Sequence, residues 1–357
     1  MNIPFNHPEL NAAEAIYAAQ KIAFSPMTFQ AVRIAWKRGL LDNLAKNTQG
    51  LTPKSLAKNV GMRLYGVRVI LESCLSIAVV SFKNEKYFIT KIGQIILHDE
   101  MTQINFNYNH DVNYLGLFYL EESIDNATPV GLHKTFGSWP TIYPALTSLP
   151  EPAQSSWFTF DHYYSDNAFA TALPHVFKHQ PKTLMDIGGN TGKFSISAAN
   201  YNDKTQITII DLPEQLAVAK TNISQAGFSD RINTIPINML DHSQALPKNY
   251  ETIWMSQFLD CFGEDDIIAI LKRSAQAMSQ DSRLFVLETY WDNQQFESAA
   301  FCVVNTSPYF TAMANGTSRM YRVSDMLNFM NQAGLEVIEK IEHIGMGHTL
   351  LEAKLTQ

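Results

Sequence analysis

The sequence predicts an α/β protein in which a doubly wound sheet follows an N-terminal domain that is helical apart from one β-hairpin. At 357 residues the chain exceeds the usual size of one hydrophobic core, so we expect more than one domain. Strand-like and helix-like segments alternate only after Lys182, whereas the segment before about residue 110 is mostly helix-like. We therefore expect an N-terminal domain over residues 1–110, a helical linker over 111–180 and the sheet domain over 181–357.

The N-terminal domain is predicted to begin with helices between about residue 10 and residue 46. Ala, Leu and Met are frequent in this segment, which favours helix. Apolar residues also recur there at helical intervals, among them Ala31, Ile34, Ala35 and Leu41.

A winged helix is predicted next. Thr52 can cap a helix that begins with Pro53 and ends at Gly61. A second helix follows, with one predicted apolar face made of Leu64, Val67, Leu71 and Leu75. Segments 78–82 and 87–90 flank a polar turn and predict a β-hairpin. Helix, helix and hairpin together are typical of a winged helix.

The charge of this segment argues against a DNA-binding role. Residues 1–110 contain 12 Lys and Arg against 7 Asp and Glu. The predicted second helix offers only Arg63 and Arg68 as cations, while a DNA-reading helix usually needs a denser basic face. We expect no nucleic-acid partner, and we expect the apolar helices to be covered by a second copy of the chain in a homodimer.

The linker between about residue 100 and residue 180 is rich in aromatic side chains. Such residues are expected to pack a helical linker against its neighbours, and the same wall suits a planar, apolar ligand. The aromatic positions include Tyr108, Tyr114, Phe118, Tyr119, Phe136, Trp139, Tyr143, Trp157, Phe158, Phe160, Tyr163 and Tyr164.

The C-terminal domain is predicted from apolar strands separated by helix-length segments, a spacing that implies a parallel, doubly wound sheet. The predicted strands are 183–187, 206–211, 252–255 and 283–288. Two more apolar runs, 335–344 and 349–355, are joined by a glycine-containing turn.

Composition excludes several classes of protein. The formal net charge is −7, and no stretch approaches the roughly 20 apolar residues of a membrane helix. The N-terminus lacks the basic and apolar regions of an export leader, so we expect a cytoplasmic protein without a membrane partner. Cys74, Cys261 and Cys302 are far apart and odd in number, so we expect free thiols and no metal site.

A glycine-rich turn, Gly188-Gly189-Asn190-Thr191-Gly192, directly follows the first predicted strand and opens a helix. Glycines let the backbone approach a ligand closely, and the helix start presents unpaired N–H groups. A phosphate-binding loop would need Gly at Ile187 and Ser or Thr at Phe194. A dinucleotide motif that started at Gly188 would need glycines at Asn190 and Lys193. Neither motif fits.

Two acids give the turn a different interpretation. Asp186 lies two residues before the turn, and Asp211 ends the next predicted strand. An acid at the position of Asp211 can hydrogen-bond both hydroxyls of a ribose, and Asp186 can help to hold an ammonium. An amino acid joined to a nucleoside without phosphates matches both, so the pattern predicts S-adenosyl-L-methionine as cofactor.

With these residues the sequence resembles the plant-type (class I) S-adenosylmethionine-dependent small-molecule O-methyltransferases, as a bacterial member. The resemblance covers nearly the whole chain, including the winged helix, the turn after Asp186, Asp211-Leu212-Pro213 and Ala333-Gly334-Leu335. It implies a Rossmann-like methyltransferase sheet and an N-terminal dimerisation domain. It also implies a domain-swapped dimer in which the N-terminal part of one copy closes the pocket of the other.

The resemblance also implies roles for individual residues. The cofactor would contact Asp186, Gly188, Gly189, Gly192, Asp211, Leu212 and Ser256, with Asn238 and Met239 bordering the adenine. The acceptor would contact Phe158 and His162 on the linker helix, and Phe310 and Met313 on a later helix.

Several positions depart from the family pattern. Asn190 replaces a glycine, a change that Asn tolerates because it adopts positive φ more readily than most residues. Asn238 stands where the family usually has an acid, and Asp260 occupies the position of the family's catalytic His. Glu288 keeps the carboxylate that flanks that position, whereas the second flanking carboxylate is replaced by Ser318 or Tyr321.

These departures leave the proton acceptor open. An ordinary Asp, with a pKa of about 3.9, is a poor base for a phenol with a pKa of about 10 unless burial raises the pKa of the carboxyl. We therefore name Asp260, His162 and Glu288 as candidate catalytic residues. O-methylation of a small aromatic, phenolic acceptor is the leading prediction, and methylation of a phenol ring carbon comes second. The pattern is also compatible with a protein that binds the cofactor without catalysis and with a winged-helix regulator.

Overall fold

The computed structural model describes Pro4, Phe5 and residues 7–356 of the chain. The first three residues, on which the expectation of no export leader partly rests, lie outside the described residues. The chain forms two compact units: residues 7–109 make the N-terminal unit, and the rest of the described chain makes the second.

The N-terminal unit begins with three helices, α1 (Ala12–Ala23), α2 (Ser25–Lys37) and α3 (Leu40–Lys46). The next helix, α4 (Pro53–Val60), begins and ends as predicted. The side chain of Thr52 accepts a hydrogen bond from the backbone N–H of Ser55, and Gly61 ends the helix with a φ of 64°.

The predicted apolar face of helix α5 (Leu64–Ser76) is partly wrong. The buried residues are Val67, Ile70, Leu71 and Cys74, while Leu64 is only half-buried and Leu75 is 37% exposed. The buried face of α5 therefore includes Ile70 and Cys74, two positions that the sequence pattern did not single out.

Strands β1 (Val80–Lys83) and β2 (Lys86–Ile89) form the predicted antiparallel hairpin. Asn84 and Glu85 make its two-residue turn, with φ values of 51° and 59°, as tight hairpins require. Helices α6 (Lys91–His98) and α7 (Glu100–Tyr108) complete the unit. The predicted winged-helix arrangement is thus present, packed around a core that includes Leu41, Leu56 and Leu71.

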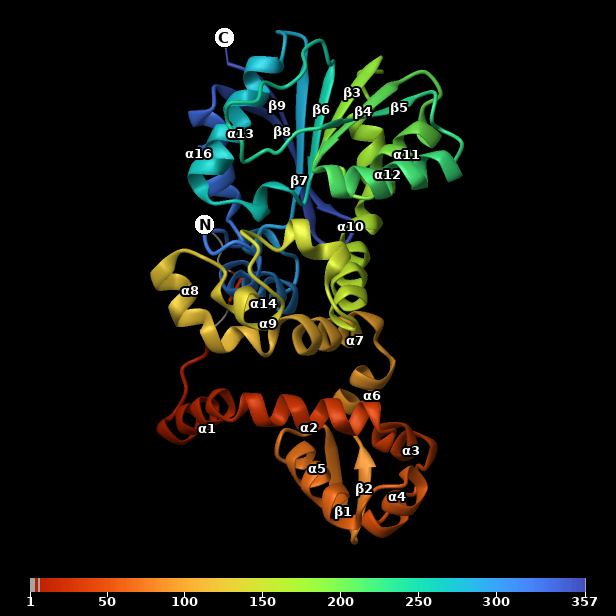
Figure 1. The fold of residues 1–357 in the computed structure, drawn as a ribbon. Coiled ribbons are helices and arrows are strands. Elements are labelled where there is room, and N and C mark those ends of the chain that lie inside the picture. The colour runs from red at the N-terminus through yellow and green to blue at the C-terminus, as the bar shows by residue number, and fades with distance from the viewer. Residues whose placement is uncertain (1–3, 6, 357) are drawn as a thin grey trace. The chain divides into compact units, whose positions relative to one another are not determined.

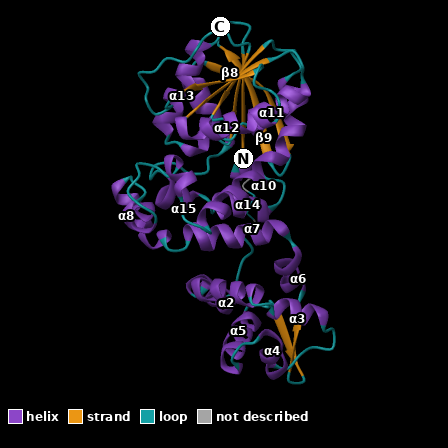
Figure 2. Ribbon diagram, turned by 45° about the vertical axis from the view of Figure 1, so that its right-hand side comes forward, coloured by secondary structure: helices purple, strands orange, loops and turns teal. Residues whose placement is uncertain are grey.

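The linker is helical, as expected, but it consists of short pieces before one long helix. A π-helix η1 (Asn109–Asn113) and a 3₁₀ helix η2 (Gly116–Tyr119) lead into α8 (Leu120–Asn126), α9 (Val130–Thr135) and η3 (Tyr143–Ser148). The long helix α10 (Ala153–Val176) then runs to the sheet. Figure 2 shows these segments as helices and loops without strands.

The second unit contains a seven-stranded sheet with the strand order β5-β4-β3-β6-β7-β9-β8. Strands β3 to β7 are parallel to one another, whereas the C-terminal hairpin of β8 and β9 is antiparallel. The strands are β3 (Thr183–Ile187), β4 (Gln206–Asp211), β5 (Ile232–Pro236), β6 (Thr252–Ser256), β7 (Arg283–Glu288), β8 (Leu335–Ile344) and β9 (His348–Leu355). The doubly wound fold is confirmed, and β5 is the strand that the sequence pattern missed.

Helices cover both faces of this sheet (Figure 1). On one face, helices α11 (Lys193–Tyr201) and α12 (Pro213–Gln225) and the end of α10 pack around Trp254 and Phe285. On the other face, helices α13 (Glu264–Ala277) and α16 (Val323–Gln332) pack around Met255 and Val286. The parallel strands are therefore buried on both sides, so their carboxyl ends form one defined edge for a binding site.

Shorter helical segments follow the carboxyl ends of the strands. They are η4 (Leu259–Cys261) after β6, then η5 (Trp291–Asn293), α14 (Glu297–Val304), α15 (Ser307–Tyr309) and the π-helix η6 (Phe310–Ala314) after β7. Across the residues that the structure describes, none of the helices has both the length and the apolar character needed to cross a lipid bilayer.

Candidate functional site

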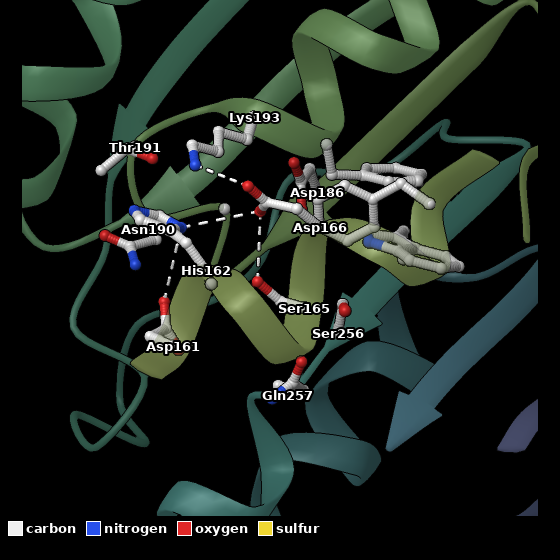
Figure 3. Close-up of a pocket in the computed structure, with 15 residues that line it drawn as sticks. Asp161, His162, Ser165, Asp166, Asp186, Asn190, Thr191, Lys193, Ser256 and Gln257 are labelled. Atoms are coloured by element: carbon white, nitrogen blue, oxygen red, sulfur yellow. Dashed lines mark hydrogen bonds and ion pairs between the residues drawn. The ribbon is translucent and has the colours of Figure 1, made fainter. Parts of the chain in front are cut away.

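A small cavity of about 70 Å³, open to solvent, lies at the carboxyl ends of β3 and β6 (Figure 3). Its walls come from the glycine-rich turn, from the first residues of α11 and from the middle of α10. The lining residues are Asp161, His162, Ser165, Asp166, Phe169, Asp186, Gly188, Gly189, Asn190, Thr191, Lys193, Phe194, Trp254, Ser256 and Gln257. This is the edge of a doubly wound sheet where ligands usually bind.

The glycine-rich turn needs glycine at its first position. Gly188 has a φ of 76°, and a Cβ atom there would lie 2.1 Å from the ring of Phe258. Asn190 has a φ of 48°, which confirms that Asn serves in place of glycine at this position. Gly192 has a φ of 83° and directly precedes helix α11. The turn therefore folds as the sequence predicts.

Asp186 lies at the bottom of the cavity. Its side chain is 2% exposed, and its Oδ2 accepts a hydrogen bond of 2.6 Å from the hydroxyl of Ser195. Burial raises the pKa of Asp186 to about 7, and the nearby charge of Asp211 acts in the same direction. Burial thus disfavours the ionised carboxylate of Asp186. A bound ammonium would stabilise this carboxylate, because it would supply a positive charge and N–H donors.

Asp211 ends β4 and holds the glycine-rich turn. Its Oδ2 accepts a hydrogen bond of 2.8 Å from the backbone N–H of Asn190, and its Oδ1 accepts one of 2.7 Å from Leu212. Burial raises the pKa of Asp211 to about 6, although these two backbone donors oppose the rise. Each carboxylate oxygen can accept a second hydrogen bond, so two ribose hydroxyls could still be bound.

Buried polar atoms without partners test whether a polar ligand fits the cavity. Among the described residues that line it, the Oγ of Ser256, the Nε1 of Trp254 and the Oδ1 of Asn190 have no hydrogen-bond partner. Buried polar atoms in folded proteins are usually paired, so these atoms favour a polar ligand. The ring of Phe194 stacks on Trp254 at 4.1 Å and forms an apolar surface beside them.

Five predicted cofactor residues do not line this cavity: Gly192, Asp211, Leu212, Asn238 and Met239. Asn238 is exposed, whereas Met239 is 5% exposed and its carbonyl oxygen accepts a hydrogen bond from the guanidinium of Arg273. The cavity thus corresponds to the part of the site around Asp186 and Ser256.

Helix α10 places a network of charged residues along the cavity (Figure 3). The Nζ of Lys193 lies 2.6 Å from Oδ2 of Asp166. The Nδ1 of His162 lies 3.6 Å from Oδ1 of Asp166 and 3.8 Å from Oδ2 of Asp161. His162 therefore lines the cavity, and its ring lies between the carboxylates of Asp161 and Asp166.

Asp260 and Glu288 lie close together beyond the end of β6. The Oε1 of Glu288 accepts backbone hydrogen bonds from Phe258 at 3.0 Å and Leu259 at 2.9 Å, so it holds the segment that carries Asp260. Burial raises the pKa of Asp260 to about 7. Burial also raises the pKa of Glu288 well above its usual range, and the charge of Asp260 adds to the effect. Neither residue lines the cavity itself.

Three of the four residues predicted to contact the acceptor, Phe158, Phe310 and Met313, lie outside the cavity lining. The ring of Phe158 stacks on His162 with centroids 6.0 Å apart. Phe310 and Met313 are both buried in η6. A Cβ atom on Gly116 would lie 1.9 Å from the sulfur of Met313, so Met313 packs directly on that glycine.

Sequence reasoning missed several residues that the fold brings to the cavity. Trp254 was assigned only to a strand, and Asp161 and Asp166 were not considered at all. A usable signal was the spacing of His162 and Asp166, because residues four apart on a helix face each other. Within the described residues, no group of three or more His, Cys, Asp or Glu side chains is arranged to hold a metal ion.

Comparison with protein families matches both parts of the chain. The Dimerisation2-like domain matches residues 17–87, and the O-methyltransferase domain matches residues 169–336. The first match covers most of the winged-helix unit, and the second begins in α10 and includes the sheet as far as the start of β8.

Individual proteins are similar over most of their length. L-tyrosine C(3)-methyltransferase of Streptomyces lavendulae is 22% identical over 91% of this chain and 88% of its own. Bacteriochlorophyllide d C-20 methyltransferase of Chlorobaculum tepidum is 19% identical over 92% of this chain and 95% of its own. The structure of mitomycin 7-O-methyltransferase has a TM-score of 0.71 and 17% identity, over 96% of this chain and 98% of its own. The chain therefore carries a Dimerisation2-like domain and an O-methyltransferase domain, and it is a methyltransferase that uses S-adenosylmethionine.

Proposed function

We propose that the protein transfers the methyl group of S-adenosylmethionine to the phenolic oxygen of a small aromatic acceptor. The observation that carries this proposal is Asp260, which is buried just beyond the cofactor cavity with a pKa raised to about 7. Such a carboxyl is matched to proton transfer near neutral pH, whereas an ordinary Asp is not. Bound S-adenosylmethionine supplies an electrophilic methyl group.

In the proposed site each cofactor residue has one task. Asp186 binds the ammonium, Asp211 binds the ribose hydroxyls, and Ser256 donates its unpartnered hydroxyl to the cofactor. Gly188, Gly189 and Gly192 let the turn come close to the ligand, and Leu212, Asn238 and Met239 border the ribose and adenine. In this assignment residues 1–110 form the dimerisation domain, 111–180 the acceptor-lining linker and 181–357 the methyltransferase domain.

The acceptor residues then act on the phenol. Asp260 accepts the hydroxyl proton or orients the hydroxyl by a hydrogen bond, and Glu288 holds the backbone on which Asp260 sits. His162 is the alternative base from α10. Phe158, Phe310 and Met313 provide apolar surface for the ring. Transfer of a methyl group from a sulfonium to a phenolate neutralises two charges, so a dry site that aligns the two reactants favours it.

Product analysis tests this function. The purified protein is incubated with S-adenosylmethionine and a panel of phenols, and products are identified by mass and NMR. We expect a new methoxy resonance. A protein that binds the cofactor but methylates none of the phenols would contradict the proposal.

Methylation of a ring carbon ortho to the phenol is the second candidate. Two observations favour it: Asp260 replaces the family's usual His, and two relatives matched over most of this chain are named as carbon methyltransferases. Both candidates need a phenolate-like nucleophile, so a pH profile cannot separate them. The same NMR experiment can, because an aryl methyl resonance with an intact phenol would exclude simple O-methylation.

We also propose that the protein is a homodimer in which the N-terminal part of one copy closes the pocket of the other. Helix α1 has no buried residue, although it carries Ile16 and Ile22, which are 63% and 76% exposed. Such apolar side chains favour a protein contact. Light scattering should give twice the chain mass, and Ile16→Glu with Ile22→Glu should shift the protein toward monomer, whereas a wild-type monomer would contradict the proposal. The expected location is the cytoplasm.

A further inference from the structure

Three acids from three distant segments interact near the predicted acceptor position. Asp161 comes from α10, Asp260 from η4 and Glu288 from the end of β7. After burial, the negative charge of Asp161 contributes to raising the pKa of Asp260, and the charge of Asp260 contributes to raising the pKa of Glu288. Among the described residues, the charged side chains that act most strongly on Asp260 and Glu288 are thus other acids rather than Lys or Arg. We call Asp161, Asp260 and Glu288 the acidic cluster.

Asp161 differs from Asp166, its neighbour on the same helix. Both line the cavity, but Asp166 has the Nζ of Lys193 at 2.6 Å. Burial acts to raise the pKa of Asp166, but hydrogen bonds with His162 and Lys193 lower it below its usual value. Asp161 has His162 at 3.8 Å, which is beyond hydrogen-bond distance. Burial raises the pKa of Asp161 to about 6, although the charges of His162 and Lys193 oppose the rise. Asp166 therefore has Lys193 at hydrogen-bond distance, whereas Lys193 acts on Asp161 only through its charge.

A second, independent observation points to a missing donor in the acidic cluster. Glu288 is 1% exposed, and its Oε2 has no hydrogen-bond partner. The hydroxyl of Tyr290, which is also 1% exposed and acts electrostatically with Glu288, has no partner either. Leaving such buried atoms unpaired is costly, so they mark a shortage of hydrogen-bond partners on this side of the site.

The chemistry of the acidic cluster selects the kind of ligand. A metal ion is disfavoured, because the described residues contain no group of three or more potential ligands arranged to hold one. An ammonium fits better, since it brings a positive charge and N–H donors without requiring fixed coordination geometry. An anionic acceptor would be repelled by Asp161, because a carboxyl with a pKa of about 6 is mostly ionised at neutral pH.

We propose that the acidic cluster makes this enzyme specific for aromatic acceptors that carry a protonated amine, and that Asp161 is the specificity-determining residue that binds the ammonium. Asp161 is suited to this contact because its side chain is 25% exposed at the cavity wall, whereas Asp260 is 7% exposed. The inference rests on the proposed methyl transfer to an aromatic acceptor and adds the charge of that acceptor.

Three phenols of similar shape test the proposal: tyramine, with an ammonium; tyrosol, with a neutral hydroxyl; and phloretate, with a carboxylate. Each is titrated calorimetrically into the full-length protein saturated with S-adenosylhomocysteine. We expect tyramine to bind at least about tenfold more tightly than tyrosol, and phloretate to bind most weakly, because a hydrogen bond between two charged groups is stronger than one from a neutral hydroxyl.

Variants assign the preference to Asp161. Asp161→Asn should remove most of the difference between tyramine and tyrosol, and Asp161→Glu should keep it. Asp125→Asn, an exposed acid on α8, removes the same formal charge elsewhere and should leave the preference unchanged. The affinity for S-adenosylhomocysteine should stay within about twofold in all variants, and melting curves should confirm that each is folded.

Equal binding of the three phenols, binding of none of them, or an undiminished preference in Asp161→Asn would overturn the proposal. A loss of S-adenosylhomocysteine affinity in Asp161→Asn equal to the loss for tyramine would also overturn it, since Asp161 would then serve the cofactor. Methylation of tyrosol as efficient as that of tyramine would leave the proposed function standing without the charge preference. Cofactor binding without methylation of any phenol would instead contradict the proposed function.

Discussion

The acids on the cofactor side of the site and the acids of the acidic cluster are held in opposite ways. Asp211 accepts backbone hydrogen bonds from Asn190 of the glycine-rich turn and from its own neighbour Leu212, and Asp186 accepts one from the side-chain hydroxyl of Ser195 in the next helix. Burial raises the pKa of both Asp260 and Glu288, and the charge of Asp260 raises that of Glu288 further. The acids of the cofactor side are therefore held by hydrogen bonds within the protein, whereas on the acceptor side Oε2 of Glu288 has no partner although its Oε1 accepts two backbone hydrogen bonds.

This difference indicates where the chemistry takes place. Hydrogen bonds that join the end of β4 to the glycine-rich turn, and α11 to β3, give a rigid binding surface, as a cofactor common to many enzymes requires. Like charges that are buried together are costly for folding, and groups perturbed in this way are concentrated at functional sites. A change on the cofactor side should therefore reduce binding, and a change on the acceptor side should reduce turnover.

The largest expected effect is that of Asp260→Asn on turnover. Removing a general base typically costs about 10²- to 10⁴-fold in rate, and we expect a loss in that range. The affinity for S-adenosylmethionine, measured by calorimetry, should change by less than about twofold, because Asp260 contacts the acceptor only. Unaltered turnover would remove Asp260 from the mechanism and leave His162 and Glu288 as the groups to examine.

Gly188→Ala should destabilise the cofactor side by about 2–4 kcal/mol, because the new methyl group meets the ring of Phe258 and the backbone has a positive φ. Gly227 is a matched control, since its φ of 78° is similar and a Cβ atom there meets nothing within 4 Å. Gly227→Ala should cost about 1 kcal/mol from backbone strain alone. Denaturant unfolding measures both, and equal costs would show that the contact with Phe258 is unimportant.

Asp211→Ala should weaken S-adenosylmethionine binding by about 10- to 100-fold, because it removes hydrogen bonds between charged and polar groups that are each worth about 1.5–3 kcal/mol. Asp230→Ala, at an exposed acid after α12, should leave the affinity unchanged. Calorimetry at one pH compares the two variants. If the Asp211 variant bound the cofactor as tightly as the wild type, the ribose assignment would be wrong.

The smallest expected effect is a pH dependence of stability from the acceptor side. The pKa of Asp260 is about 7 in the folded protein, above its unfolded value of about 3.9, so the folded state binds more protons between these pH values. Ionisation of Asp260 therefore destabilises the folded protein. This destabilisation is absent below about pH 4 and grows as the pH rises to 7. Relative to wild type, Asp260→Asn should gain about 2–4 °C in melting temperature between pH 5 and pH 8. A constant difference would contradict the raised pKa.

Local patterns were sufficient for much of the fold. Thr52, Pro53 and Gly61 mark the ends of α4 because a capping side chain, a proline and a positive-φ glycine act on their own neighbours. Strand β5 was missed because only Ile232 of its five residues is buried, and it ends in Pro236 at the edge of the sheet. The buried face of α5 was partly misassigned because periodicity alone cannot choose between adjacent apolar rows.

The sequence by itself determined the turn from Gly188 to Gly192 and Asp186 just before it, since these residues are neighbours along the chain, whereas the tertiary structure brought Asp211 from the end of β4 to the backbone N–H of Asn190. Only the tertiary structure brought Asp161 of α10 into electrostatic contact with Asp260, and Asp260 beside Glu288. These residues are far apart in sequence, and burial is the first cause of their raised pKa values. Burial depends on what the rest of the fold packs around a carboxyl, which no local pattern encodes.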